Sequence, residues 1–174
     1  MPPCKRIYIV GFMGSGKSTA GKKLAVGLGW SFIDLDKKIE KTVGKTITEI
    51  FSDSGEEFFR KLESETLRSI DIQRDSVISV GGGTPCFSDN MDFMNNTGIV
   101  IYLKMTPQQL KSRLSGEPDA RPLLKGLEEN DLHQYIEKKL LEREKYYNQA
   151  LVIVNGTNLN IKKLIDKVNV LLQG

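Results

Sequence analysis

Five short apolar runs, separated by longer stretches of helical character, constrain the fold of this 174-residue chain more than any other feature. The runs are rich in isoleucine and valine and cover residues 7–10, 32–34, 77–80, 99–103 and 151–154. Nearly continuous apolar runs of this length are typical of strands that are covered on both faces by helices. The alternation of strand and helix therefore predicts one α/β domain over residues 1–174, a three-layer, doubly wound sheet of five parallel strands.

The stretches between the runs carry helix signals. Residues 19–28 and 161–168 each place apolar side chains on one stripe at helical spacing. Ser54 and Glu57 match the pattern of a capping box, which predicts that a helix begins at Ser54. Thr106 followed by Pro107 predicts another helix start. The segment SGEPDARPLLKG, residues 115–126, has no periodicity, and a mobile loop is expected there.

The segment GFMGSGKST follows the first predicted strand directly and matches the Walker A pattern. Its glycines let successive backbone N–H groups point inward, and the start of the next helix adds partial positive charge. Lys17 would reach the β- and γ-phosphates, and the Ser18 hydroxyl would bind Mg²⁺. The alternative, a glycine turn without a ligand, is disfavoured by the strand before it and the helix after it. The predicted ATP contacts here are Gly14, Ser15, Gly16, Lys17, Ser18 and Thr19.

The second apolar run ends on two acids, Asp34 and Asp36, in the segment FIDLD. Residues i and i+2 of a strand point to the same side, so the sequence predicts that the two carboxylates share one region of space. Ligands bind at the carboxyl ends of the strands in an open α/β sheet, so we expect Asp34 to bind Mg²⁺ with Ser18. The alternative for Asp34 is a helix N-cap. Asp36 is a candidate for orienting a hydroxyl group that accepts the phosphoryl group.

Two arginines and a triple glycine are further candidates for an acceptor site. Arginine binds carboxylates and phosphates with two parallel hydrogen bonds and keeps its charge. Arg60 and Arg143 both lie in predicted helices, where the alternative is a solvated face with ion pairs to neighbouring glutamates. Gly81–Gly83 follow the third predicted strand, and glycines there allow the backbone to approach a ligand closely.

Composition argues against several other classes of function. The net charge of +3 is too small to indicate nucleic-acid binding, and no basic stripe with interleaved aromatics is present. The apolar runs are far too short for a membrane span, and no signal-peptide pattern precedes the first of them. Cys4 and Cys86 lack metal-ligand spacing, so a reducing cytoplasm is the expected location. His133 lies in a charged helix and is expected to be solvated rather than catalytic.

Taken together, the motifs resemble those of the shikimate kinase family. The matching segments are GFMGSGKST, FIDLDKKIE, EEFFRKLE, SVGGGT, RPLL at residues 121–124 and REKYY at residues 143–147. They occur in the family's order and with its spacing over essentially the whole chain. The resemblance implies a P-loop kinase of the nucleoside monophosphate kinase-like fold, with strand order 2-3-1-4-5 and a lid loop at about residues 113–126. It also implies transfer of the ATP γ-phosphoryl group to the 3-hydroxyl of shikimate.

The resemblance assigns roles to individual residues. Asp36 would bind the ring hydroxyls and serve as base or orienting group, within an acceptor-binding region at about residues 34–62. Arg60 and Arg143 would hold the carboxylate, and the Gly81–Gly83 backbone would line the ring. Arg121 would contact ATP and the transferring phosphoryl group from the lid, and with Lys17 and Asp36 it completes the predicted catalytic set.

Further residues are candidates for supporting roles. Arg113 and Asn155 are candidates for contacts with the adenine, and Glu63 could position Arg60 or form a surface pair. The expected ligands are ATP with Mg²⁺ and shikimate, and a monomer is expected. A related small-molecule kinase, such as one acting on gluconate, a nucleotide kinase and a catalytically silent nucleotide-binding module remain alternatives.

Overall fold

The computed structural model describes residues 5–70, 73–115 and 129–173, with the side chains of residues 129 and 130 excepted. Arg121 and most of the predicted lid lie outside the described residues. The elements in chain order are β1 (Arg6–Val10), α1 (Lys17–Leu28), β2 (Ser31–Asp34), α2 (Leu35–Val43), α3 (Ile47–Arg68), β3 (Ser76–Ser79), the 3₁₀ turn η1 (Thr84–Cys86), α4 (Asn90–Thr97), β4 (Ile99–Lys104), α5 (Pro107–Leu114), α6 (Glu129–Tyr147), β5 (Val152–Asn155) and α7 (Ile161–Gln173).

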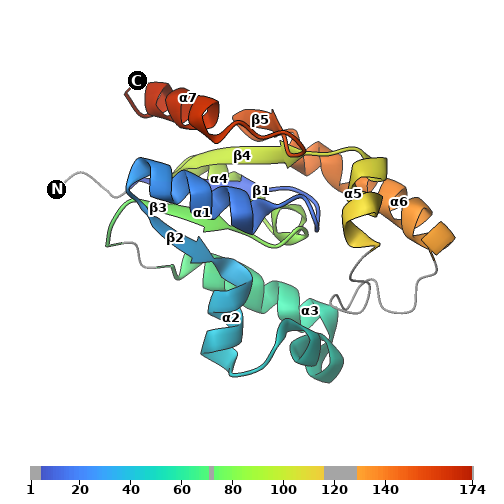
Figure 1. Cartoon of the computed structure of the whole chain (residues 1–174). Helices are drawn as coiled ribbons and strands as arrows, with labels where there is room; N and C mark the ends of the chain where they lie inside the picture. Colours follow the sequence, from blue (N-terminus) through green and yellow to red (C-terminus); the bar gives the residue numbers. More distant parts are fainter. Residues whose placement is uncertain (1–4, 71–72, 116–128, 174) are drawn as a thin grey trace.

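The five strands form one parallel sheet in the order β2-β3-β1-β4-β5, which confirms the predicted strand order (Figure 1). The central strand β1 pairs with β3 on one side and β4 on the other, so that Ile7 is flanked by Val77 and Ile99. Because all strands run in the same direction, the loops that follow them meet at one edge of the sheet. The phosphate-loop motif, Asp34 and Gly81–Gly83 all follow strands at this edge.

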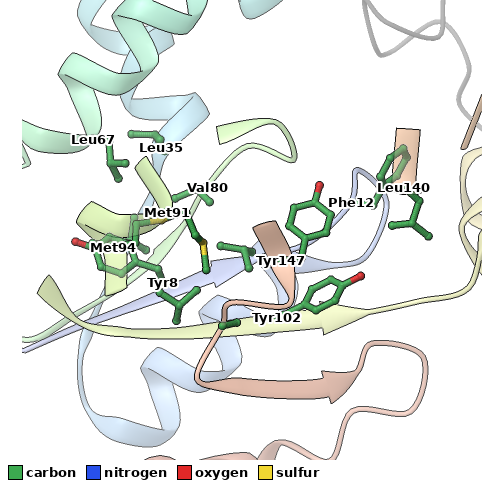
Figure 2. Close-up of a cluster of buried hydrophobic side chains, with 14 of the residues drawn as sticks. Tyr8, Phe12, Leu35, Leu67, Val80, Met91, Met94, Tyr102, Leu140 and Tyr147 are labelled. Atoms are coloured by element: carbon green, nitrogen blue, oxygen red, sulfur yellow. The ribbon is translucent and has the colours of Figure 1, made fainter. Parts of the chain in front are cut away.

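Alternate residues of the strands contribute to two apolar layers on opposite faces of the sheet. Ile7 and Ile9 of β1 belong to a layer with residues of α1 and α7, whereas Tyr8 and Val10 belong to a second, larger cluster. That second cluster includes Leu35 of α2 and side chains of α3, α4, α5 and α6 (Figure 2). Helices α2 and α3 therefore share their apolar core with the sheet. No helix in the described part of the chain is long and apolar enough to cross a membrane.

The helix start predicted at Ser54 is right only for the second part of α3, which resumes after a kink at Gly55, because the helix itself begins earlier. Helix α3 starts at Ile47 with a capping box in which Thr46 accepts from the Glu49 amide and the Glu49 carboxylate accepts from the Thr46 amide. Gly55 interrupts the helix with φ 80° and ψ 174°, a left-handed φ that favours glycine. The predicted start at Thr106 is confirmed, since Thr106 caps α5 in a capping box with Gln109 and Pro107 occupies the first turn.

Candidate active site

The phosphate loop joins β1 to α1 and has the backbone geometry that its glycines predict. Gly14 and Gly16 have φ values of 79° and 87°, and α1 begins at the next residue, Lys17. The Lys17 ammonium donates to the Phe12 carbonyl at 2.9 Å, which holds the side chain across its own loop. A helix N-terminus with inward-facing amides and a lysine is the arrangement that binds phosphate groups.

Asp34 caps a helix and also contacts Ser18, the other residue predicted to bind Mg²⁺. Its Oδ1 accepts from the Lys37 amide at 3.2 Å, which makes Asp34 the N-cap of α2. Its Oδ2 accepts from the Ser18 hydroxyl at 2.7 Å, and the Ser79 hydroxyl lies 3.4 Å from that of Ser18. A carboxylate and a hydroxyl oxygen in contact beside the phosphate loop are the hard oxygen ligands that Mg²⁺ prefers, so these two residues fit a magnesium ion.

Asp36 reaches the site from a helix and not from a strand. Strand β2 ends at Asp34 and α2 begins at Leu35, so the expectation that both acids project from one side of a strand is wrong. The two carboxylates are nevertheless close enough to interact. The pKa of Asp36 is raised to about 6, mainly by burial and also by the charges of Glu63 and Asp34, against the lowering effect of Lys17. A carboxylate with this pKa can accept a proton at neutral pH.

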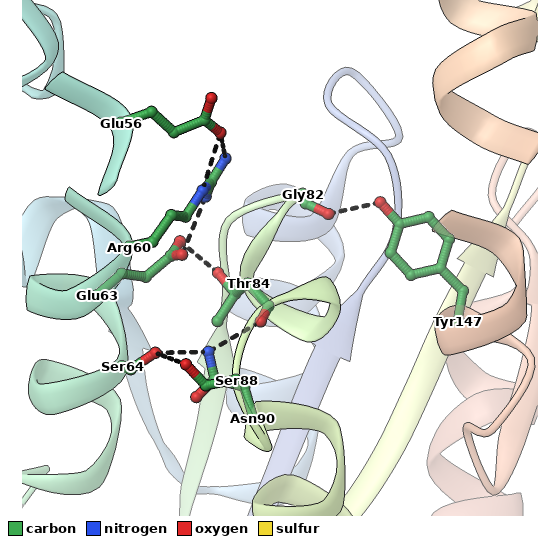
Figure 3. Close-up of polar contacts among 9 residues, drawn as sticks. All are labelled: Glu56, Arg60, Glu63, Ser64, Gly82, Thr84, Ser88, Asn90 and Tyr147. Carbon is green, nitrogen blue, oxygen red and sulfur yellow. Dashed lines mark hydrogen bonds and ion pairs between the residues drawn. The ribbon is translucent and has the colours of Figure 1, made fainter. Parts of the chain in front are cut away.

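Arg60 is buried, and its guanidinium is held by two glutamates of its own helix (Figure 3). It donates to Glu56 from Nε at 3.2 Å and from Nη2 at 3.0 Å, and to Glu63 from Nη1 at 3.0 Å. The guanidinium carbon lies 4.3 Å from the centre of the Phe87 ring. The alternative for Arg60 is wrong in one part: the ion pair with Glu56 forms, but Arg60 itself is buried and does not lie on a solvated face.

Glu63 is fully buried and connects Arg60 to the turn that follows the triple glycine. Its second carboxylate oxygen accepts from the Thr84 hydroxyl at 2.5 Å. Burial raises the pKa of Glu63, and the charge of Arg60 is the largest opposing influence. The sequence left open a surface pair for Glu63, and the structure excludes it. The capping pattern and apolar stripe gave no signal that this position would be buried.

Arg143 reaches the same region from α6. It is buried, and its guanidinium lies 5.4 Å from the centre of the Phe12 ring. Its Nη1 has no hydrogen-bond partner among the described residues. A buried guanidinium nitrogen with an unsatisfied donor is costly unless a ligand pairs with it, so this nitrogen fits a bound anion.

Gly81–Gly83 pass so close to these groups that an added Cβ at Gly81 or Gly83 would displace a neighbouring side chain. A Cβ at Gly81 would lie 2.8 Å from Glu63 Oε1 and 3.3 Å from Asp36 Oδ1. A Cβ at Gly83 would lie 2.6 Å from Arg60 Nη2. The triple glycine thus brings the backbone directly against the acid and the arginine of the site, as its composition predicts.

These side chains line one cavity of about 140 Å³ beside the phosphate loop. Its lining comprises Met13, Asp36, Ile47, Phe51, Phe59, Arg60, Glu63, Gly81, Gly82, Gly83 and Arg143. Every acceptor-side residue predicted from the sequence is therefore in this cavity. The apolar walls from Ile47, Phe51 and Phe59 were not predicted, because periodicity alone assigns such residues to the core.

A second cavity, of about 250 Å³, lies on the other side of the phosphate loop. It is lined by Ser15, Gly16, Thr19, Arg113 and Thr157, among others. The Arg113 guanidinium lies 3.4 Å from the carbonyl oxygens of Gly14 and Gly156 and so bridges the phosphate loop and the segment after β5. Asn155 does not line this cavity: its side chain accepts from the Thr157 amide at 2.8 Å and faces a separate surface hollow with Lys104 and Glu144. Its predicted adenine contact stays a prediction.

Comparison with known proteins gives a consistent result. The family model for shikimate kinase matches residues 13–172. The shikimate kinase of Parabacteroides distasonis is 44% identical over 155 residues, which cover 89% of this chain and 90% of that protein. That of Azobacteroides pseudotrichonymphae is 42% identical over 166 residues, covering 94% and 97%.

Solved structures of shikimate kinases have the same fold as this chain. A crystal structure of shikimate kinase from Bacteroides thetaiotaomicron superimposes with a TM-score of 0.87 at 40% identity, covering 98% of this chain and 99% of that one. Shikimate kinase from Acinetobacter baumannii, solved in complex with shikimate, gives a TM-score of 0.85 at 33% identity, covering 98% and 93%. The chain belongs to the shikimate kinase family and is an ATP-dependent kinase.

Proposed function

We propose that this chain transfers the γ-phosphoryl group of ATP to the 3-hydroxyl of shikimate, giving shikimate 3-phosphate and ADP. The observation that carries the proposal is the single cavity in which Asp36, Arg60, Gly81–Gly83 and Arg143 meet beside the phosphate loop. Shikimate has one carboxylate and three hydroxyl groups, which two buried arginines and one carboxylate complement. The relative from Acinetobacter baumannii, solved with shikimate, supports the same choice of acceptor.

Each acceptor-side residue has a chemical role in this proposal. Arg143 pairs with the substrate carboxylate, which supplies the partner that its Nη1 lacks among the described residues. Arg60, oriented by Glu56 and Glu63, contributes the second positive charge. Asp36 orients the 3-hydroxyl and accepts its proton as the new O–P bond forms. The backbone of Gly81–Gly83 lies against the ring.

On the nucleotide side, the phosphate loop binds the phosphates of ATP. The amides of Gly14–Thr19 and the Lys17 ammonium bind the β- and γ-phosphates, and Arg113 lies beside the adenine. Ser18 and Asp34 would hold Mg²⁺, which neutralises phosphate charge when bound. Arg121, outside the described residues, would add a positive charge at the transferring group, and Asn155 stays a candidate for an adenine contact. A monomer in the cytoplasm is proposed as the working form.

The test is a panel of acceptors in one assay of ADP release with ATP and Mg²⁺. The panel contains shikimate, quinate, gluconate, AMP and no acceptor. We expect fast release with shikimate alone, because its carboxylate and three ring hydroxyls complement the two arginines and Asp36, whereas quinate adds a fourth hydroxyl on a saturated ring, gluconate is acyclic and AMP carries a base and a phosphate. Equal rates with gluconate would favour the related small-molecule kinase. A rate that does not depend on any acceptor would contradict the proposal.

A further inference from the structure

Tyr147, the last residue of α6, is fully buried although it carries a polar hydroxyl. It lies one helical turn after Arg143, so both side chains are on one face of the helix. The Tyr147 hydroxyl donates a hydrogen bond of 2.5 Å to the backbone carbonyl of Gly82 (Figure 3). The helix that supplies an arginine to the acceptor cavity is thereby attached to the glycine segment that lines the same cavity.

The three carbonyl groups of the glycine segment are satisfied in different ways. The Gly81 carbonyl accepts from the Thr84 amide at 3.1 Å, and the Gly83 carbonyl accepts from the Cys86 amide at 2.9 Å. Both of these bonds belong to the turn that follows the glycines. The Gly82 carbonyl points away from that turn and is held by the Tyr147 side chain. The orientation of the middle peptide therefore depends on a residue 65 positions later in the chain.

Gly82 also lies against the phosphate loop. A Cβ at Gly82 would be 3.1 Å from the Met13 amide nitrogen and 3.4 Å from the Gly11 carbonyl oxygen. The glycine backbone is thus enclosed by the phosphate loop on one side and by Tyr147 on the other. Phosphoryl transfer requires the attacking oxygen and the phosphorus to be held about 3–3.5 Å apart, so the spacing between these two loops bears directly on the rate.

We propose that Tyr147 is a positioning residue, whose hydroxyl fixes Gly82 and Arg143 relative to the phosphate loop and so sets the alignment of acceptor and donor. The inference rests on the proposed function, since the acceptor whose alignment is at stake is shikimate. Burial raises the pKa of Tyr147, with Arg143 the largest opposing influence, so the phenol remains a hydrogen-bond donor at neutral pH.

The chain offers a matched control for this hydroxyl. Tyr102 of β4 is also buried, and its ring centre lies 5.0 Å from that of Tyr147. Its hydroxyl has no hydrogen-bond partner among the described residues. Tyr147→Phe and Tyr102→Phe therefore remove the same atom from neighbouring buried rings, and only the first removes a hydrogen bond to the active site.

The experiment compares the parent enzyme with Tyr147→Phe and Tyr102→Phe in steady-state kinetics, with shikimate and ATP varied separately. For Tyr147→Phe we expect kcat/KM for shikimate to fall by about tenfold, the effect of one lost hydrogen bond at a partly buried carbonyl, with KM for ATP changed less than about twofold. For Tyr102→Phe we expect both constants within about twofold of the parent. Amide hydrogen exchange of residues 80–86 should be faster than in the parent enzyme for Tyr147→Phe, but not for Tyr102→Phe.

Several outcomes would overturn the inference. Parent-like kinetics for Tyr147→Phe, or equal losses in the two variants, would show that the hydroxyl does not position the acceptor. A lower melting temperature for Tyr147→Phe with unchanged kcat and unchanged kcat/KM for shikimate would assign it a structural role only. Failure of the parent enzyme to phosphorylate shikimate would instead contradict the proposed function, so the two failures are distinguishable.

Discussion

The pKa of Asp36 is raised to about 6, because the fold buries it near two other acids, Glu63 and Asp34. With its pKa raised to about 6, the carboxylate loses its ability to accept a proton as the pH falls below that value. We expect kcat/KM for shikimate to decrease about tenfold per pH unit below pH 6. A pH–rate profile at saturating ATP measures this decrease of kcat/KM at acidic pH. The ordinary carboxyl pKa of about 4 places the ionisation of shikimate itself lower.

Because phosphate groups also ionise near pH 6, the assignment of this decrease needs a variant as control. Glu63→Gln removes the negative charge that is the second largest cause of the raised pKa of Asp36. The inflection of the pH–rate profile should therefore move to lower pH in Glu63→Gln, even if the variant is slower at every pH. An inflection that stays in place would assign the decrease to a group other than Asp36.

The variants Asp34→Asn and Asp36→Asn should lose activity in different ways. The new side chain in Asp34→Asn can still cap α2, because asparagine is a good N-cap, so the fold should be retained. We expect Asp34→Asn to need more Mg²⁺ for activity, and Asp36→Asn to lose kcat by about 10² with little change in ATP affinity. Kinetics and nucleotide affinity across a Mg²⁺ series separate the two. Rescue of Asp36→Asn by excess Mg²⁺ would show that both acids serve the metal.

At the scale of single residues, the sequence revealed those groups whose chemistry is carried by a motif. Lys17, Ser18 and Asp34 could be predicted because the phosphate loop and a strand end determine their positions. The contact of Glu63 with Arg60 was one of two predicted alternatives, but the bond of Glu63 to Thr84 and that of Tyr147 to Gly82 could not be predicted, because each joins segments far apart in the chain. Nothing in local spacing distinguishes such a residue from an ordinary core or surface position.

At the scale of elements, the glycine segment between β3 and η1 is shaped by close contacts. Gly83 has φ −86°, a conformation that alanine adopts without strain, so the effect of Gly83→Ala is steric. Its methyl group would lie 2.6 Å from Arg60 Nη2 and would displace the guanidinium. We expect KM for shikimate to rise at least about fivefold, the low end of the cost of overpacking. Steady-state kinetics with each substrate varied in turn measures this.

The control for Gly83→Ala is Gly29→Ala at the end of α1, outside the cavity lining. Gly29 has φ 70°, and a Cβ added there would meet no other group within 4 Å, so alanine strains the backbone without touching a neighbour. It should lower the melting temperature and leave both KM values unchanged. If the two variants have the same kinetics, the contact between Gly83 and Arg60 does not matter for binding.

Element order and strand order were predictable because both follow from apolar runs and from the resemblance, whereas element boundaries were not. The run at residues 77–80 is buried throughout, yet Val80 lies beyond the end of β3. The second half of α3 resumes after Gly55, close to the predicted start, but the capping box that begins the helix is Thr46 and Glu49. The segment contains two capping patterns, and local sequence alone does not tell which of them begins the helix.

At the scale of the whole molecule, the acceptor side and the nucleotide side are built on one sheet. Helices α2 and α3 contribute Leu35, Ile39, Ile50 and Leu67 to the same apolar cluster as Tyr8 of β1. A region that shares its core with the central strand should not unfold by itself. If residues 1–174 form a single domain, the whole chain should unfold in one cooperative step.

We expect one thermal transition, shifted as a whole by either ligand. A ligand at 100 times its Kd stabilises the folded state by about 2.7 kcal/mol, which for a domain of this size raises the melting temperature by about 5–10 °C. Calorimetry with shikimate alone, with ATP and Mg²⁺ alone and with neither measures the shift. Because both ligands bind one cooperative unit, shikimate should protect the strands β1 and β4 from hydrogen exchange as well as α2 and α3. Two separate transitions, or protection by shikimate confined to residues 35–68, would show that the acceptor-binding helices are an independent unit.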